Sequence, residues 1–298
     1  SEILLQKYLW YVFQSHYFRR FIKERVEGSV IPHLYQRDFE EFIISLPNIK
    51  EQVKISNILE LIDKKIEINS RINSLLEIIS KLIFKKWFLD FNDIKKKNSE
   101  NNSELISRYI DILNGCAFKS KDYTEKGIFL LRTKNLKNGL TKRMHDDVFL
   151  PKSFLNTHKD YICEMHDYHL IMVGASLGER GMIFHQLPAL RNQNMWCFRS
   201  KNKNLFSPLL VKFFVDELLK KMIKTASGSA REFFRKEDFK KQTIFFGTET
   251  KQKTFSNYSI NILKKISNNL LENEILLKTK KILLKKLISG EMRIKSND

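Results

Sequence analysis

Apolar side chains recur at helical spacing near the start of the chain. Residues 2–27 carry an apolar face rich in aromatic rings, which includes Tyr8, Val12 and Phe13. This spacing predicts a helix over 2–27, and the Gly28-Ser29 pair that follows is typical of a helix end.

Two longer stretches show the same kind of pattern with a seven-residue step. The first runs from Glu51 to about Phe91 without glycine or proline, and the second covers about 250–289. At 1.5 Å per residue, a helix of some forty residues measures roughly 60 Å, longer than an ordinary surface helix of a small domain. The positions at this step are Ile55, Ile62, Asn69, Leu76 and Ile83 in the first stretch, and Ile262, Asn269, Leu276 and Leu283 in the second.

Asn69 and Asn269 take the same position in these two apolar seams. A buried asparagine in such a seam costs stability but selects one register when it finds a polar partner. One hypothesis is therefore that the two asparagines set the register of the long helices. The alternative, which we weigh equally, is that both lie at the solvated edge.

The chain carries short apolar runs typical of strands, one before the first long helix and the others in the region between the two long helices. A helix is expected from Ser207-Pro208 to about Lys224, because serine caps a helix and proline suits its first turn. Since most of the region reads as strand with few helices, we predict the α+β class. The strand-like runs are Phe42–Ile44 before Pro47, then Ile106–Leu113, Ile128–Thr133, His169–Val173, Met182–His185, Met195–Arg199 and a closing Thr243–Phe246.

The chain repeats itself at an offset of 200 residues. When Gly28–Lys86 is laid on Gly228–Lys286 without a gap, 18 of the 59 positions are identical. Chance would give only about 5 matches, so we infer the duplication of a unit that ends in a long helix. The predicted organisation is 1–46, the remnant of a first domain; 47–91, a central helix; 92–104, a polar linker; 105–247, a complete domain; and 248–298, a C-terminal helix and tail.

The charge balance of the chain is strongly basic. A net charge of +19 and a pI near 9.7 favour a polyanionic partner, because neutralised phosphates release their counterions. Ribosomal or membrane-surface binding and a general lysine bias are the alternatives. Three scattered cysteines indicate a reducing compartment, and no segment reads as a transmembrane helix or a signal peptide. We therefore expect a cytoplasmic protein, truncated at its N-terminus because it lacks an initiator Met.

The sequence offers no assembled catalytic or metal site. Phosphate-binding loops, dinucleotide fingerprints, zinc-protease motifs and serine nucleophile elbows are all missing. Cys163, His166 and His169 stand at ligand-like spacing, but no second pair completes a structural zinc site, so we expect no metal. The glycines of 174–181 are explained by a tight turn between two strands.

Three loops collect the residue types that contact DNA. Lysine and arginine bind phosphates, whereas arginine, asparagine and related side chains read base edges. A solvated surface role remains the alternative for each residue, and Asn192-Gln193-Asn194 equally suits a turn at a strand end. The candidate DNA-binding residues are Lys119, Lys121, Arg132, Lys134 and Asn135; Ser176, Arg180, Arg191, Asn192 and Asn194; and Ser229, Arg231 and Arg235.

Several segments resemble one family, the specificity subunits of type I restriction-modification enzymes. Ser45–Gln52 with Ile62–Glu67 is similar to the end of a target-recognition domain entering its spacer helix. Asn114–Tyr123 resembles the opening of the second such domain, and Gly174–Gly181 with Leu190–Asn194 resembles its middle. Leu287–Ile294 is similar to the family's C-terminal tail. The matches run through the chain in family order.

The resemblance implies a mostly-β target-recognition domain and two long helices that form an antiparallel coiled coil. It implies a non-catalytic subunit that reads DNA and directs methylation and cleavage by partner subunits. The expected partners are double-stranded DNA, methylation subunits, a motor-nuclease subunit and, as a further candidate, a second specificity chain. No cofactor is expected on this chain, whereas S-adenosylmethionine, ATP and Mg²⁺ belong to the partners.

One departure from the family pattern changes the expectation for this chain. Most of the first recognition domain is missing, because only 1–46 precede the central helix. This puts in doubt whether the chain alone reads a two-part site. Two other hypotheses stay open: a coiled-coil scaffold that binds nucleic acid nonspecifically, and a nuclease whose site carries no recognised motif.

Overall fold

The computed structural model describes residues 3–26, 35–89, 103–226 and 235–294. The chain divides into two compact units, Ser1–Ser74 with Asn268–Asp298, and Leu75–Ser267. Two long helices, α4 (Ile49–Phe84) and α9 (Glu249–Ile288), contribute to both units. Within the described ranges, none of the helices combines the length and apolarity that a membrane span requires.

The first unit packs short helices against parts of α4 and α9. Its other elements are α1 (Gln6–Gln14), α2 (His16–Val26) and α3 (Gln36–Glu40). Tyr8 and Val12 of α1 are fully buried, because they share a core with Ile55 and Leu59 of α4 and with Leu284, Leu287 and Ile288 of α9. The apolar face read from the sequence is therefore the face that packs.

Two local expectations for this unit are wrong in detail. The helix expected over 2–27 is interrupted at Ser15, whose backbone is extended and whose Oγ accepts a hydrogen bond from the N–H of Phe18 at 3.2 Å. The serine thus satisfies an amide at the start of α2. No strand forms at Phe42–Ile44, which lies in irregular backbone.

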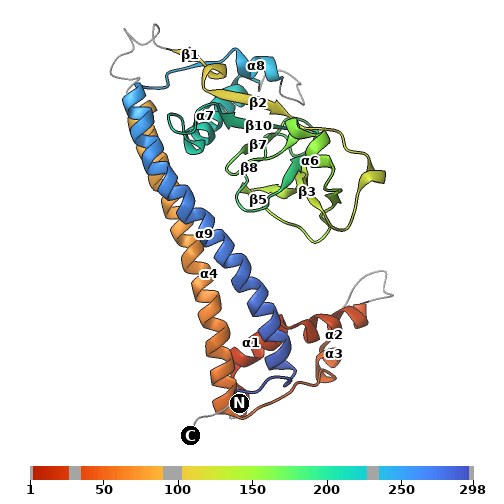
Figure 1. Ribbon diagram of the computed structural model, residues 1–298. Coiled ribbons are helices and arrows are strands. Elements are labelled where there is room, and N and C mark those ends of the chain that lie inside the picture. The colour runs from red at the N-terminus through yellow and green to blue at the C-terminus, as the bar shows by residue number, and fades with distance from the viewer. Residues whose placement is uncertain (1–2, 27–34, 90–102, 227–234, 295–298) are drawn as a thin grey trace. The chain divides into compact units, whose positions relative to one another are not determined.

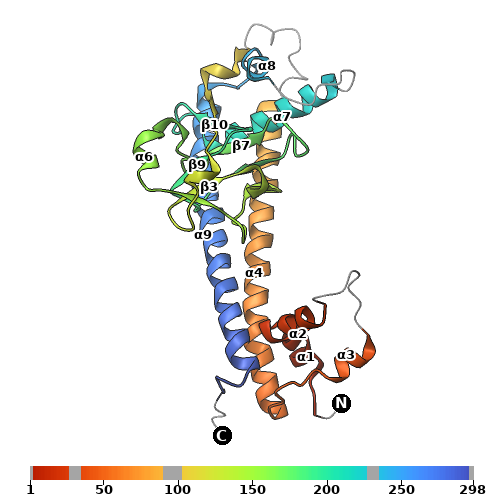
Figure 2. The same cartoon turned by 90° about the vertical axis from the view of Figure 1, so that its right-hand side faces the viewer.

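The two long helices lie side by side and antiparallel (Figure 1 and Figure 2). In the first unit, Lys280 Nζ of α9 binds Asp63 Oδ1 of α4 at 2.6 Å, and in the second unit the ring of Phe88, just beyond α4, contacts Phe255 of α9. Residues late in one helix thus meet residues early in the other, as the resemblance implied. The helix expected to about Phe91 changes at Lys85–Leu89, which form a π-helical turn.

The described part of the second unit contains a β domain with three sheets. A six-stranded sheet has the order β2-β10-β7-β8-β5-β4, a three-stranded sheet has the order β6-β3-β9, and β1 pairs with β11. The strands are β1 (Glu104–Leu105), β2 (Ile110–Asn114), β3 (Ile128–Leu131), β4 (Leu136–Lys137), β5 (Gly139–Thr141), β6 (Phe149–Leu150), β7 (Tyr168–Ile171), β8 (Arg180–Met182), β9 (Ala189–Arg191), β10 (Met195–Ser200) and β11 (Thr243–Ile244).

Each strand-like run within 105–247 contains or overlaps a strand, but the lengths differ. The run at Ile106–Leu113 begins with a 3₁₀ turn, and the run at Met182–His185 overlaps β8 only at Met182. The sequence pattern missed β1, β4, β5, β6 and β9, which have only two or three residues each. Strands this short show too little alternation to be recognised from sequence.

Helices hold the β domain to the rest of its unit. The longest is α7 (Pro208–Ala226), which begins at the predicted Ser207-Pro208 pair and packs on β10 and β7. Shorter helices are α6 (Phe154–Thr157) and α8 (Lys236–Lys240). Phe239 of α8 is fully buried against Trp196 of β10.

The duplication read from the sequence is confirmed in the element boundaries. Helix α3 starts at residue 36 and α8 at 236, while α4 starts at 49 and α9 at 249. Gln52 and Gln252 also play the same part, since each amide group donates to backbone carbonyls in the segment before its long helix. The chain therefore contains the same helical framework twice.

Candidate nucleic-acid interface

Three loops of the β domain meet through backbone hydrogen bonds. The N–H of Cys116 donates to the carbonyl of Arg191 at 3.2 Å, and the N–H of Gln193 donates to that of Cys116 at 2.8 Å. The N–H of Met172 donates to the carbonyl of Asn194 at 3.1 Å. The loops after β2, β7 and β9 are thereby joined into one surface, although they are far apart in sequence.

Glycine is required where the first of these loops touches the third. A Cβ built on Gly115 would lie 1.8 Å from the backbone oxygen of Asn192, too close for any side chain. Between β7 and β8, Gly174 and Gly178 have φ of 90° and 85°, which favours glycine. The expected turn between two strands at 174–181 is confirmed, since β7 and β8 pair antiparallel.

Five of the predicted DNA-binding residues are exposed on or beside these loops. Lys119 precedes the 3₁₀ turn Ser120–Asp122 after β2 and Lys121 lies within it. Ser176 lies between β7 and β8, Asn194 precedes β10, and Arg235 precedes α8. Their side chains are accessible to a large ligand. The remaining candidates between α7 and α8, Ser229 and Arg231, lie outside the described residues.

Lys236 connects the start of α8 to the first loop. Its Nζ lies 3.4 Å from Oδ1 of Asn114 at the end of β2. Partial burial lowers the pKa of Lys236, and the nearby Lys240 lowers it further, while Glu237 acts in the opposite direction. A phosphate group beside Lys236 would favour its charged form, because an opposite charge raises the pKa of a lysine.

Arg191 and Asn135 are buried and have internal roles, contrary to the expectation that they contact DNA. The guanidinium of Arg191 is 1% exposed, and it donates to the backbone oxygens of Asn114 at 2.7 Å, Ile162 at 3.0 Å and Asp160. Asn135 is fully buried and donates to the carbonyl of Lys142 at 3.0 Å. Both side chains tie loops together, so neither reaches a nucleic acid in this structure.

Three other predicted cations are half-buried and engaged with acidic or carbonyl groups. Arg132 and Lys134 both donate to the backbone oxygen of Asp146, at 2.9 and 2.8 Å. The hydrogen bond from Lys134 lowers the pKa of the Asp146 carboxyl. Arg180 Nε lies 2.6 Å from Asp216 Oδ1 on α7. To contact DNA, these cations would therefore have to give up their contacts with Asp146 and Asp216.

Asn192 and Asn194 form the turn that the sequence offered as an alternative. They lie between β9 and β10, where Oδ1 of Asn192 accepts a hydrogen bond from the N–H of Gln193 at 2.8 Å. Asn194 has a φ of 69°, a conformation that asparagine tolerates better than most residues. The turn presents Gln193 and Asn194 to solvent, so a structural role and a reading role are compatible here.

The sulfur and imidazole groups near β7 lie in the core of the domain. His169, Cys197 and Asp167 bring possible ligand atoms within 4.8 Å of one another, and all three are buried. Arg199 already binds both carboxylate oxygens of Asp167, at 2.8 and 2.6 Å. Burial opposes ionisation of Asp167, but the hydrogen bonds from Arg199 lower its pKa. This carboxylate is therefore part of an internal ion pair, and the donor set does not suit a cation.

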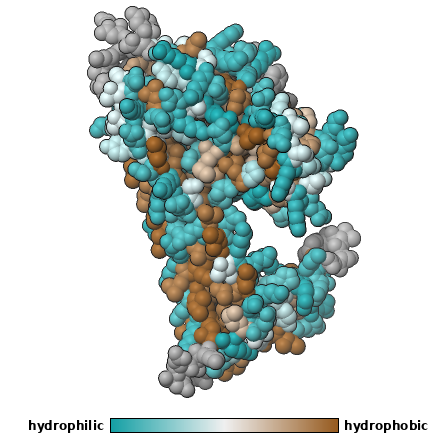
Figure 3. All heavy atoms as spheres, in the orientation of Figure 1, coloured by the Kyte–Doolittle hydropathy of each residue, from teal (hydrophilic) through white to brown (hydrophobic). Residues whose placement is uncertain are grey.

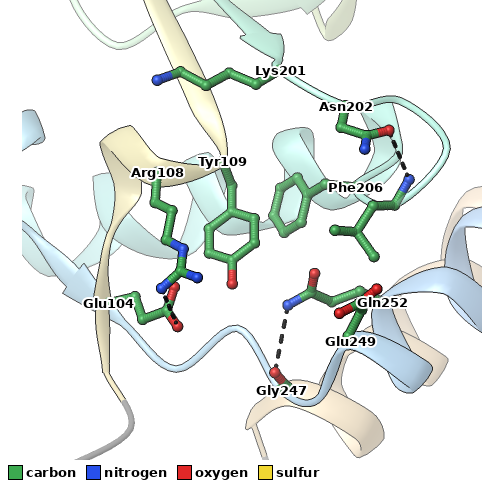
Figure 4. Close-up of a pocket in the computed structure, with 10 residues that line it drawn as sticks. Glu104, Arg108, Tyr109, Lys201, Asn202, Phe206, Gly247, Glu249 and Gln252 are labelled. Atoms are coloured by element: carbon green, nitrogen blue, oxygen red, sulfur yellow. Dashed lines mark hydrogen bonds and ion pairs between the residues drawn. The ribbon is translucent and has the colours of Figure 1, made fainter.

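A pocket of about 400 Å³ that sequence reasoning missed lies beside Tyr109 in the second unit (Figure 4). Tyr109 packs on Phe206, and Gln252 points toward the tyrosine. Glu104 and Glu249 balance Arg108 and Lys201 around the pocket, so it lacks the excess positive charge of a phosphate site. The only sequence feature that pointed to this pocket was Gln252, which lines it and which the repeat shares with Gln52.

The fold and the loop surface define a class: a duplicated helical framework that carries a β domain with an exposed basic loop surface. The family described as "Type I restriction modification DNA specificity domain" matches residues 1–78. The MjaIX specificity subunit of a type I restriction enzyme from Methanocaldococcus jannaschii is 27% identical over 311 residues, which cover 98% of this chain and 70% of the relative. The MjaVIII specificity subunit from the same organism is 25% identical over 314 residues, covering 99% and 72%.

A solved structure shows the same fold. The S subunit of a type I restriction-modification system from M. genitalium superposes with a TM-score of 0.58 at 17% identity, covering 96% of this chain and 73% of that chain. The sequence matches extend over nearly the whole chain, so the protein is similar to the specificity subunits of type I restriction-modification systems, and the solved structure shows that the fold is shared.

Proposed function

We propose that this chain is a sequence-specific DNA-reading subunit of a type I restriction-modification complex. The observation that carries the proposal is the surface formed by the loops after β2, β7 and β9. It joins exposed Lys119 and Lys121, suited to phosphates, with exposed Ser176 and Asn194, suited to bases. The relation to specificity subunits and the net charge of +19 support the same conclusion.

The chain acts by recognition, and partner subunits carry out the chemistry. The buried Asp167, His169 and Cys197 are held in the core, where no substrate has access. S-adenosylmethionine, ATP and Mg²⁺ belong to the methylation and motor-nuclease subunits in this proposal. Purified chain with Mg²⁺ alone should therefore neither methylate nor cleave DNA.

An exposed apolar stripe on α4 supports docking of methylation subunits. Leu61, Ile68, Leu75 and Leu82 recur every seven residues, and each is more than half exposed. Apolar side chains also gather along the paired long helices in Figure 3. A heptad stripe left open on a helix fits the apolar face of another helix, so we assign it to amphipathic helices of the methylation subunits.

The helical framework of the first unit supports a second recognition domain in the assembly. Trp10 of α1 is 62% exposed, whereas Leu210 on the sheet-covered helix α7 is fully buried. Phe39 is 44% exposed, whereas Phe239 is buried under Trp196. The described β domain already covers α7 and α8. A second β domain of the same kind is therefore the partner that fits the α1–α3 surface.

Co-expression with methylation subunits of the type I class tests the proposed function. The complex should methylate one defined DNA sequence, detected by mapping modified bases across a genome. Exchange of the β domain for that of a relative should change the methylated sequence. Methylation that ignores the exchange would overturn the proposal.

The exposed stripe also favours the competing hypothesis of a scaffold with nonspecific DNA binding. Competition of a methylated-site duplex against random duplex separates the two hypotheses. A reader should prefer its site by roughly a thousandfold or more at physiological salt, whereas a scaffold shows equal affinity for both.

A further inference from the structure

A cluster of four asparagines, of which two are buried, joins α4 to α9 inside the first unit. Asn69 is fully buried, and its Nδ2 donates to Oδ1 of Asn273 at 2.9 Å and to Oε2 of Glu272 at 2.8 Å. Asn269 is 1% exposed, and its Nδ2 donates to Oδ1 of Asn73 at 2.8 Å. The side-chain N–H groups of Asn69 and Asn269 thus each find an acceptor on the opposite helix.

The cluster has the symmetry of the duplication. Asn69 and Asn269 are repeat counterparts, as are Asn73 and Asn273. The bond from Asn69 to Asn273 is therefore repeated by the bond from Asn269 to Asn73. Two further contacts lie beside the Asn69–Asn273 pair. Asn273 Nδ2 is 3.3 Å from Ser70 Oγ, and Lys65 Nζ is 3.3 Å from Glu272 Oε2.

The apolar seam alone cannot specify this pairing. Apolar residues recur every seven positions on both helices, so a slip by one heptad again places apolar residues against apolar residues. The same slip would separate Asn69 from Asn273 and Asn269 from Asn73, leaving buried amides without partners. Unpaired buried polar groups are costly, and the native register avoids that cost.

We infer that Asn69, Asn73, Asn269 and Asn273 form a two-fold register lock for the paired helices. The lock selects register at the expense of stability, since Oδ1 of Asn69 is buried and has no partner within the described structure. A slip of one heptad would move one helix along the other by about 10 Å. Resting on the proposed function, this makes the lock a determinant of which DNA spacing the complex accepts.

The test measures the register directly by electron-spin distance spectroscopy on the full chain. Spin labels are placed at Glu67→Cys and Lys285→Cys, two exposed positions on α4 and α9, in a Cys116→Ser background. The parent protein should give one narrow distance. In Asn69→Leu/Asn269→Leu, a second distance should appear in roughly a tenth or more of the molecules, while the melting temperature rises.

A matched control is available in the same repeat. Asn57 and Asn257 are also counterparts on the two helices, but both are exposed, so Asn57→Leu/Asn257→Leu should keep the single distance. The single variant Asn69→Leu, which leaves Asn269 bound to Asn73, should give a smaller second population. One unchanged narrow distance in both lock variants would overturn the inference. Because no DNA takes part, this result is independent of the proposed function.

Discussion

Phe39 and Phe239 occupy the same position in the repeat but have different environments. Phe239 is fully buried, with its ring 5.5 Å from that of Trp196 on β10, whereas Phe39 is 44% exposed. We expect Phe239→Ala to lower the free energy of unfolding of the second unit by about 3–5 kcal/mol, the cost of emptying a buried aromatic site. Phe39→Ala should cost the first unit less than about 1 kcal/mol. Chemical denaturation followed by hydrogen exchange measures both, and equal losses would show that the counterpart surfaces are packed alike.

Lys119 and Lys121 should contribute to DNA affinity through charge. If each neutralises one phosphate, Lys119→Ala/Lys121→Ala should reduce the slope of log affinity against log salt by about 2. Fluorescence anisotropy with duplex DNA over a range of salt concentrations measures this slope. Lys137→Ala/Lys142→Ala, at the opposite edge of the six-stranded sheet, is the matched control. If the control reduces the slope equally, the contact surface lies elsewhere.

Arg191 should be required for folding of the β domain. Arg191→Ala removes a buried guanidinium and leaves three backbone oxygens without their donor, so the free energy of unfolding should fall by about 3 kcal/mol or more, at roughly 1–3 kcal/mol for each unsatisfied group. Thermal melting of the variant measures the loss. A variant as stable as the parent but defective in DNA binding would instead indicate a direct contact.

Acid should destabilise the β domain through His169. Burial lowers the pKa of His169 from 6.5 to about 4. Between pH 6.5 and about pH 4, His169 is therefore protonated in the unfolded chain but neutral in the folded chain. The stability from the neutral imidazole is complete above about pH 6.5 and falls by about 3 kcal/mol as the pH drops to about 4.

The measurement compares urea unfolding between pH 7 and pH 4 for the parent and for His169→Gln. The stability of the variant should depend less steeply on pH, because it lacks the imidazole that takes up a proton only on unfolding. His145 has a side chain that is 97% exposed, and His145→Gln should keep the parent slope. Parallel curves for all three proteins would contradict the assignment.

Charge on the exposed stripe of α4 should block assembly without unfolding the chain. Leu61→Glu/Ile68→Glu changes two positions that are 66% and 52% exposed, so the melting temperature should change little. Co-purification with methylation subunits should fall at least tenfold, because a charged group would be buried in the helix contact. Glu67→Gln on the same helix serves as control, and retained assembly in the double variant would remove the stripe from the interface.

Much of the helical framework was predictable from the sequence, because its information is local. The seven-residue step and the absence of glycine and proline gave the long helices to within a few residues of their observed ends, apart from the π-helical turn after Phe84. The 200-residue offset predicted two equivalent frameworks. The sequence left open whether Asn69 lies in the seam or at its solvated edge, and the structure places it in the seam, bonded to Asn273.

The sites of the β domain depend on contacts between distant segments, and only the tertiary structure decided them. Arg191 and Lys119 look alike in the sequence, since both are cations beside polar residues in a loop. Folding buries Arg191 because carbonyls from Asn114, Asp160 and Ile162, up to 77 residues away, converge on it, whereas Lys119 stays exposed. The periodicity of one segment records which face is apolar, but it carries no information about which distant backbone groups will close around a side chain.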